Sequence, residues 1–109
     1  MAAFRSTRDV ILRTEAMGEA ARFYETLLGL KASLRQDGLV GFETGSFQFF
    51  VEQGAPAHGP VFEFCVPNVA TEKTRLVAAG CTVVEEDPQI PRCYLRDPYG
   101  LVFNLRQEE

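Results

Sequence analysis

The sequence predicts an α+β fold built from two βαβββ modules. The same order of apolar runs, helical spacing and glycine-containing turns occurs twice, with an offset of about 51 residues between Gly29 and Gly80. Each repeat contains one helical segment and several short strand-like runs bounded by turn residues. A sheet with a helix on one face only must bury or use its other face. We therefore expect a curved, mostly antiparallel eight-stranded sheet around a cleft.

The first module is expected over about residues 1–53. It opens with an apolar strand at residues 10–12 and continues into a helix that starts near Met17. The predicted buried face of this helix has i, i+3, i+4, i+7, i+10 and i+11 spacing and consists of Met17, Ala20, Ala21, Tyr24, Leu27 and Leu28. Gly29 supplies the left-handed residue that commonly ends a helix. Strands follow at residues 31–35, 39–43 and 47–52, with a tight turn at Asp37-Gly38 between the first two.

The second module is expected over about residues 60–109, after a Gly- and Pro-rich linker at residues 53–60. A strand at residues 61–66 precedes Asn68, which suits the N-cap of a helix that ends at Gly80. Strands at residues 82–85, 92–96 and 101–106 complete the module, and the segment from Asp97 to Gly100 fits a β-turn between the last two. Residues 1–109 therefore form a single domain of two modules.

The composition narrows the class of protein. A net charge of −4 and a pI of about 5.0 argue against nucleic-acid binding, which needs a basic face. No apolar run reaches the length of a membrane span, and the N-terminal residues lack a signal-peptide core, so we expect a cytoplasmic protein. Cys65, Cys81 and Cys93 have neither disulfide-framework nor zinc-site spacing, which favours small buried thiols.

Two segments carry a resemblance to a known family. One is Ala21-Arg-Phe-Tyr-Glu-Thr-Leu-Leu-Gly-Leu30, and the other is Cys93-Tyr-Leu-Arg-Asp-Pro-Tyr-Gly-Leu-Val-Phe-Asn-Leu105. At this separation they resemble the vicinal oxygen chelate superfamily, which includes glyoxalase I, extradiol dioxygenases, and the bleomycin and fosfomycin resistance proteins. The resemblance covers nearly the whole chain. It implies the glyoxalase/bleomycin resistance fold and pairing of two chains as a homodimer.

The same resemblance implies a divalent metal held by His or Gln, Glu, His and Glu from the first and last strand of each half. The corresponding residues here are Asp9, Gln48, Val61 and Asn104. None matches the usual ligand, and amide oxygens are weak ligands for zinc, nickel or iron. We therefore assign no metal ligand, no other cofactor and no catalytic residue, although the sequence does not exclude magnesium or calcium.

A polar row remains at these strand positions. Asp9, Gln48 and Asn104 belong to it, and the two-residue period of a strand adds Arg13, Phe50, Glu63 and Arg106 to the same face. These seven residues are the predicted ligand-binding residues. An apolar cleft with a few directed polar groups suits a small molecule. The alternative is an internal polar network in which Arg13, Glu63 and Asn104 satisfy one another without a ligand.

The leading hypothesis is a metal-free small-molecule binding protein that resembles the bleomycin resistance proteins. Asp9, Gln48 and Glu63 would orient an unidentified ligand, and Phe50 would stack on it. The alternative is a metal-dependent lyase, isomerase or dioxygenase of the glyoxalase type, with Asp9, Glu63 and Asn104 as ligands. A third hypothesis is a partner-binding domain whose cleft is vestigial. Whether the protein is an enzyme stays open, with the missing ligands favouring a non-enzyme. His58 is expected in an exposed linker.

Overall fold

The computed structural model describes residues 3–56, 59–89 and 92–108; His58 lies outside these ranges. The described residues form two βαβββ repeats, which confirms the predicted α+β fold. The elements in chain order are β1 (Arg5–Thr14), α1 (Met17–Thr26), β2 (Lys31–Gln36), β3 (Leu39–Glu43), β4 (Gln48–Gln53), β5 (Val61–Val66), α2 (Val69–Ala78), β6 (Thr82–Asp87), β7 (Arg92–Arg96) and β8 (Val102–Gln107). Neither helix is long and apolar enough to cross a membrane.

The described chain divides into two compact units, which we treat one at a time. The first module is Arg8–Val61, and the second module combines the described residues up to Thr7 with those from Phe62 onward. The division falls inside β1, so the N-terminal end of this strand belongs to the second module. This end was not predicted as strand, because Arg5 to Asp9 contain no apolar run.

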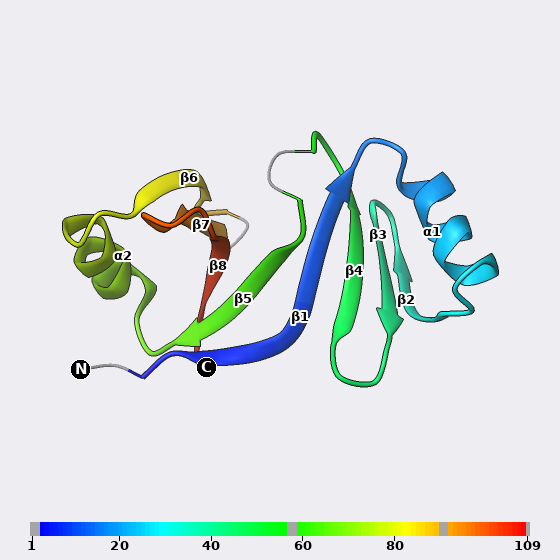
Figure 1. Cartoon of the computed structure of the whole chain (residues 1–109), viewed down its shortest axis with the longest axis horizontal. Coiled ribbons are helices and arrows are strands. Elements are labelled where there is room, and N and C mark those ends of the chain that lie inside the picture. The colour runs from blue at the N-terminus through cyan, green and yellow to red at the C-terminus, as the bar shows by residue number, and fades with distance from the viewer. Residues whose placement is uncertain (1–2, 57–58, 90–91, 109) are drawn as a thin grey trace. The chain divides into compact units, whose positions relative to one another are not determined.

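The first module has the strand order β2-β3-β4-β1, with β1 parallel to β4 and the other neighbours antiparallel. Helix α1 packs on one face of this sheet (Figure 1). The buried core between helix and sheet consists of Ala21, Val40, Phe42 and Val51. On β4, Val51 faces this core and its neighbours Phe50 and Glu52 face the other way, as strand alternation requires.

Helix α1 begins without a side-chain cap from Ala16, the residue at its N-cap position. Gln53 of β4 takes over part of that role. Its Oε1 accepts a hydrogen bond from the Met17 N–H at 3.4 Å, and its Nε2 donates to the Glu15 carbonyl at 2.7 Å. Thr14 Oγ1 accepts from the Ala16 N–H, which precedes the first turn of the helix.

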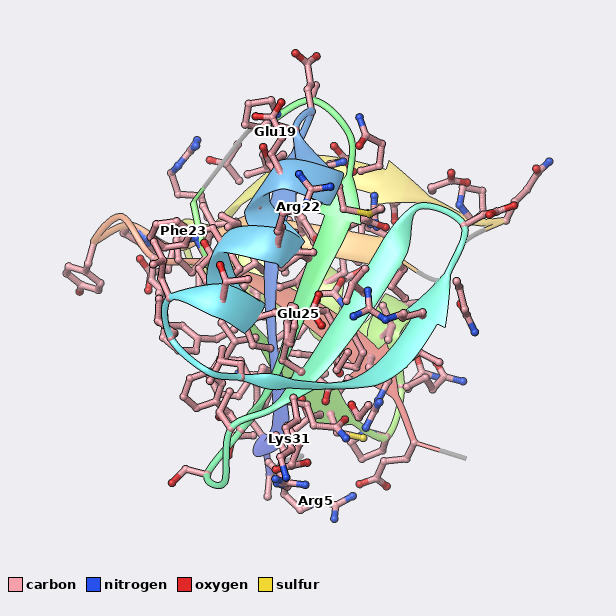
Figure 2. All side chains as sticks on the ribbon, turned by 90° about the vertical axis from the view of Figure 1, so that its right-hand side faces the viewer. Arg5, Glu19, Arg22, Phe23, Glu25 and Lys31 are labelled. Atoms are coloured by element: carbon pink, nitrogen blue, oxygen red, sulfur yellow. The ribbon has the colours of Figure 1, made fainter. Side chains whose placement is uncertain are left out.

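The predicted buried face of α1 is wrong at its C-terminal end. The helix stops at Thr26, and Leu27 and Leu28 are 72% and 55% exposed. Because the chain leaves the helical period before these residues, their spacing no longer directs them to the sheet. Gly29 has the left-handed φ of 69° that was expected, but within the turn that follows the helix. Phe23 is also exposed and projects from α1 (Figure 2).

The second module has the order β5-β8-β7-β6, with β5 parallel to β8 and the remaining neighbours antiparallel. Helix α2 is capped by Asn68, whose Oδ1 accepts from the Thr71 N–H at 2.9 Å, as predicted. The predicted turn before β8 is also confirmed, because the Gly100 N–H donates to the Asp97 carbonyl. The core under α2 consists of Val66, Cys93, Leu95, Phe103 and Leu105.

Candidate binding site

The face of the second sheet that points away from α2 carries a row of polar side chains. Glu63 of β5 pairs in register with Asn104 of β8, Asn104 pairs with Tyr94 of β7, and Tyr94 pairs with Glu85 of β6. One residue from each of the four strands therefore lies along a single line across the sheet. The alternation that predicted Glu63 and Asn104 on one face is consistent with this register.

Asn104 lies at the centre of the row and uses both ends of its amide. Its Oδ1 accepts a hydrogen bond from the Cys93 backbone N–H at 3.0 Å, and its Nδ2 donates to Glu63 Oε2 at 2.9 Å. The β7–β8 register runs from Arg96 only as far as Tyr94, so the Cys93 N–H bonds to the Asn104 side chain. Asn104 is 6% exposed, and a buried amide with both ends bonded is a fixed structural group.

Glu63 is 8% exposed and has only one of its carboxylate oxygens in a hydrogen bond. Oε2 accepts from Asn104, whereas Oε1 lies 3.4 Å from Arg106 Nη1. This distance is that of an ion pair, but Oε1 has no hydrogen bond to any described residue, so the contact is loose. A buried carboxylate oxygen with a weak partner is a ready acceptor for an N–H or O–H donor.

The far end of the row is formed by residues that were not predicted from the sequence. Arg92 Nη1 donates to Glu85 Oε2 at 3.0 Å, and its guanidinium carbon lies 5.2 Å from the centre of the Tyr94 ring. The signal for Tyr94 was present in the sequence. The turn at Asp97–Gly100 sets Arg96 opposite Val102, and counting back two residues on one strand and forward two on the other gives Tyr94 opposite Asn104.

Two surface pockets lie in the second module. One has a volume of about 430 Å³ and is lined by Arg5, Cys65, Arg106, Gln107 and Glu108. The other has a volume of about 370 Å³ at the end of β7 and is lined by Val69, Glu86, Asp87, Pro88, Arg92, Cys93, Leu105 and Gln107. Arg106 connects the first pocket to Glu63, because it lines the pocket and also contacts the Glu63 carboxylate.

The cysteines do not form a reactive cluster. All three are free thiols, and Cys93 is buried in the core under α2. Burial raises the pKa of the Cys93 thiol, with a further contribution from the Glu86 carboxylate, and burial also raises the pKa of Cys81. A raised pKa favours the neutral thiol, which is the poorer nucleophile and the poorer metal ligand.

The four predicted site residues of the first module lie on the sheet face away from α1. Asp9 pairs in register with Gln48, and Arg13 pairs with Glu52 two residues along each strand beyond Ile11 and Phe50. The Phe50 ring lies against Gly41, where an added Cβ would come within 2.8 Å of the ring. Asp9 and Gln48 are thus neighbours, whereas the Phe50 ring packs against its own sheet.

Glu43, opposite Gln48 on β3, belongs to the same polar edge of the first module. Hydrogen bonds from the Arg8 side chain and the Gly45 N–H lower the pKa of the Glu43 carboxyl, and a weaker contribution comes from the Gln48 side chain. Gln48 is therefore part of an exposed ion-pair cluster, in contrast with the buried setting of Asn104.

The donor set does not fit the divalent metal that the fold family implies. The metal position at the start of β5 holds Val61, whose side chain has no donor atom, and the position on β8 holds Asn104, whose amide oxygen already accepts from Cys93. Across the described residues, no three His, Cys, Asp or Glu side chains gather in a way that could hold a metal ion. Converting Asn104 to a ligand would break the Cys93 bond and release Glu63.

Comparison with known proteins agrees with this architecture. A protein from Vibrio splendidus 12B01, described as a glyoxalase/bleomycin resistance protein/dioxygenase superfamily member, superposes with a TM-score of 0.64 at 16% identity, covering 97% of this chain and 100% of that one. A chain from Legionella pneumophila described as an NAD-dependent benzaldehyde dehydrogenase gives 0.71 at 13% identity, with 93% and 98% covered. Both likenesses concern the fold alone.

An extradiol enzyme shares the fold over part of its length. Homoprotocatechuate 2,3-dioxygenase from Brevibacterium fuscum, in complex with 3,4-dihydroxyphenylacetate, gives a TM-score of 0.63 at 18% identity. The match covers 95% of this chain but 36% of the dioxygenase, so this chain corresponds to about a third of that enzyme. No curated protein matches the sequence.

The repeated βαβββ plan is the fold that these structures share with the chain. The model of the glyoxalase-like domain family matches residues 9–106, which is nearly the whole chain. The chain belongs to that family.

Proposed function

We propose that this protein binds a small organic molecule without a metal ion, through the polar face of its second module. The observation that carries the proposal is the state of Asn104. At a position where the superfamily resemblance implies a metal ligand, both ends of its amide are used to hold Glu63 and the Cys93 backbone. The metal position has therefore become part of a fixed polar scaffold.

Glu63 is the group that would contact the ligand. Its Oε1 has only a loose ion-pair contact, and binding an N–H or O–H donor there would satisfy a buried acceptor. Arg106 is half-exposed and could move aside while keeping its charge near the carboxylate. A cytoplasmic location and a homodimer, both expected from the sequence, belong to this proposal.

Metal content tests the metal-free part of the proposal. The purified protein is dialysed separately against zinc, nickel, manganese and iron(II), and bound metal is measured by elemental mass spectrometry together with the thermal unfolding temperature. We expect less than about 0.1 metal ion per chain and no thermal shift, because two of the four ligand positions lack an available donor. A Val61→His/Asn104→Glu variant serves as a positive control that restores the missing residue types. Near-stoichiometric metal in the unaltered protein would contradict the proposal.

Ligand binding is tested separately with Glu63→Gln, which keeps the shape of the side chain and removes its charge. Benzamidine offers paired N–H donors and a positive charge, and benzamide is its neutral counterpart. We expect benzamidine to perturb the amide NMR signals of β5 and β8 in the unaltered protein, with at least about tenfold weaker binding to Glu63→Gln. Equal binding to both proteins would remove Glu63 from the site.

A further inference from the structure

The pocket lined by Arg5, Cys65, Arg106, Gln107 and Glu108 has a different chemistry from the Glu63 position. We propose that this pocket, hereafter the Arg5–Arg106 pocket, binds a carboxylate or phosphate group of a small molecule. The inference rests on the proposed function only in taking the ligand to be a small molecule. It requires neither the free Glu63 oxygen nor any particular metal content.

The pocket is rich in donors. Two guanidiniums, a thiol and an amide line it, against the single carboxylate of Glu108. With Arg5 and Arg106 positive and Glu108 negative, its formal charge is +1 in a chain whose net charge is −4. A guanidinium offers several N–H donors in a planar fork, which matches the geometry of carboxylate and phosphate oxygens.

The strands bring these groups to one place. Cys65 of β5 pairs in register with Arg106 of β8, so their side chains are neighbours on the same face of the sheet. Arg5 approaches from the N-terminal end of β1, which belongs to the second module. The hydrogen bond and charge of Glu108, together with a smaller contribution from Cys65, raise the pKa of Arg5, so the thiol lies close to the guanidinium.

The pocket already holds one carboxylate of the chain itself. Arg5 Nη2 donates to Glu108 Oε1 at 2.5 Å. Both side chains are partly exposed, and exposed ion pairs of this kind contribute little to stability. An anion from solution could therefore replace Glu108 at Arg5 at small cost, with Arg106 of β8 as a second donor. Glu108 would then act as an internal competitor for the ligand.

Inorganic phosphate is the probe, and the Cys65 thiol inside the pocket is the reporter. The protein is alkylated with iodoacetamide at increasing phosphate and constant ionic strength, and modification at each cysteine is followed by peptide mass spectrometry. We expect saturating phosphate to slow Cys65 alkylation by about threefold or more, because the anion occupies the pocket. Cys81 is also partly exposed but lies outside the pocket, so its rate should not change.

Charge variants identify the groups responsible. Arg5→Gln should raise the phosphate concentration for half-protection by about fivefold, and Glu108→Gln should lower it by about twofold. Arg8→Gln is the matched control, because Arg8 forms an equivalent surface pair with Glu43 in the first module. Arg106→Gln should act like Arg5→Gln, but Arg106 also contacts buried Glu63, so Arg5→Gln decides the test if that variant misfolds.

Phenyl phosphate distinguishes a free anion from the head group of an organic molecule. Protection at a lower concentration than inorganic phosphate would indicate an organic ligand, and equal protection would indicate the free anion. Equal slowing of Cys65 and Cys81, or equal protection of Arg5→Gln and Arg8→Gln, would overturn the inference. Neither result would bear on the metal measurement, so the two proposals can fail separately.

Discussion

Gln48 and Asn104 each lie on the last strand of their module and face the parallel first strand, but Gln48 is the first residue of β4 and Asn104 the third residue of β8. Gln48 is half-buried and belongs to an exposed cluster with Glu43 and Arg8. Asn104 is buried and connects Glu63 to the Cys93 backbone. The comparison teaches that a shift of two residues along the last strand separates an amide in a surface cluster from an amide that supports the interior.

The largest effect that would test this comparison is expected at the amides themselves. Asn104→Leu should lower the free energy of unfolding by about 3 kcal/mol, because it leaves the Cys93 N–H and a Glu63 oxygen buried without partners. Gln48→Leu should change it by no more than about 0.5 kcal/mol, as is usual for partly exposed positions. Urea denaturation at neutral pH measures both. Similar losses for the two variants would show that the modules use their amides alike.

A second difference concerns the sheet faces that point away from the helices. This face carries the polar row in the second module, whereas in the first module Phe50 packs on Gly41. A methyl group added at Gly41 would come within 2.8 Å of the Phe50 ring. Gly41→Ala should cost about 1–2 kcal/mol, because the ring has to shift. The matched control is Gly18→Ala on α1, where an added Cβ meets nothing within 4 Å and a gain of up to about 1 kcal/mol is expected. Thermal unfolding of the two variants should therefore move in opposite directions.

The helix N-termini provide a smaller contrast. Asn68 caps α2 directly, so Asn68→Ala should cost about 1 kcal/mol. Gln53 supports α1 from β4 through a longer bond to Met17, so Gln53→Ala should cost about 0.5 kcal/mol. Hydrogen exchange of the first-turn amides in each helix would locate the losses. Loss of protection in α1 for Asn68→Ala, or in α2 for Gln53→Ala, would contradict this assignment of the caps.

The smallest effect is a pH dependence from the second module, which contains all three cysteines. The folded state raises the pKa of Cys93 above its ordinary value of 9.0, chiefly by burial. The stabilising contribution of the neutral thiol is therefore present below pH 9.0 and is lost as the pH rises above it. Unfolding measured between pH 7 and about pH 10 should show a smaller alkaline loss for Cys93→Ala. An unchanged profile would show that other groups cause the loss.

The sequence predicted the elements well because their signals are local. Turn residues and apolar alternation located β3, β5 and β7 at the observed bounds, and strand alternation put Glu63 on the same face as Asn104. The sequence could not predict that the β7–β8 pairing stops at Tyr94 and leaves the Cys93 N–H for Asn104, because the end of a ladder depends on how the strands diverge in space.

Two features of α1 could not be predicted from the sequence either. The predicted burial of its last turn was wrong, because the apolar spacing continues through Leu27 and Leu28 after the helix has ended at Thr26. Its N-terminal support comes from Gln53, which is far away in the sequence and could not be recognised by local capping rules.

The Arg5–Arg106 pocket was also not predicted from the sequence, because Arg5 precedes the apolar run that marked β1.

The parallel pairing of the first and last strand in each module has a consequence for the order of folding. The two antiparallel pairs β6–β7 and β7–β8 join neighbours in sequence, whereas Glu63 and Asn104 are 41 residues apart. Closing such a loop costs entropy, so we expect β5 to join after the β6–β8 meander has formed. During synthesis, Glu63 leaves the ribosome long before its partner and stays hydrated until the last strand arrives. The buried carboxylate is therefore desolvated in a late step, and φ-values at Glu63 close to zero would show it.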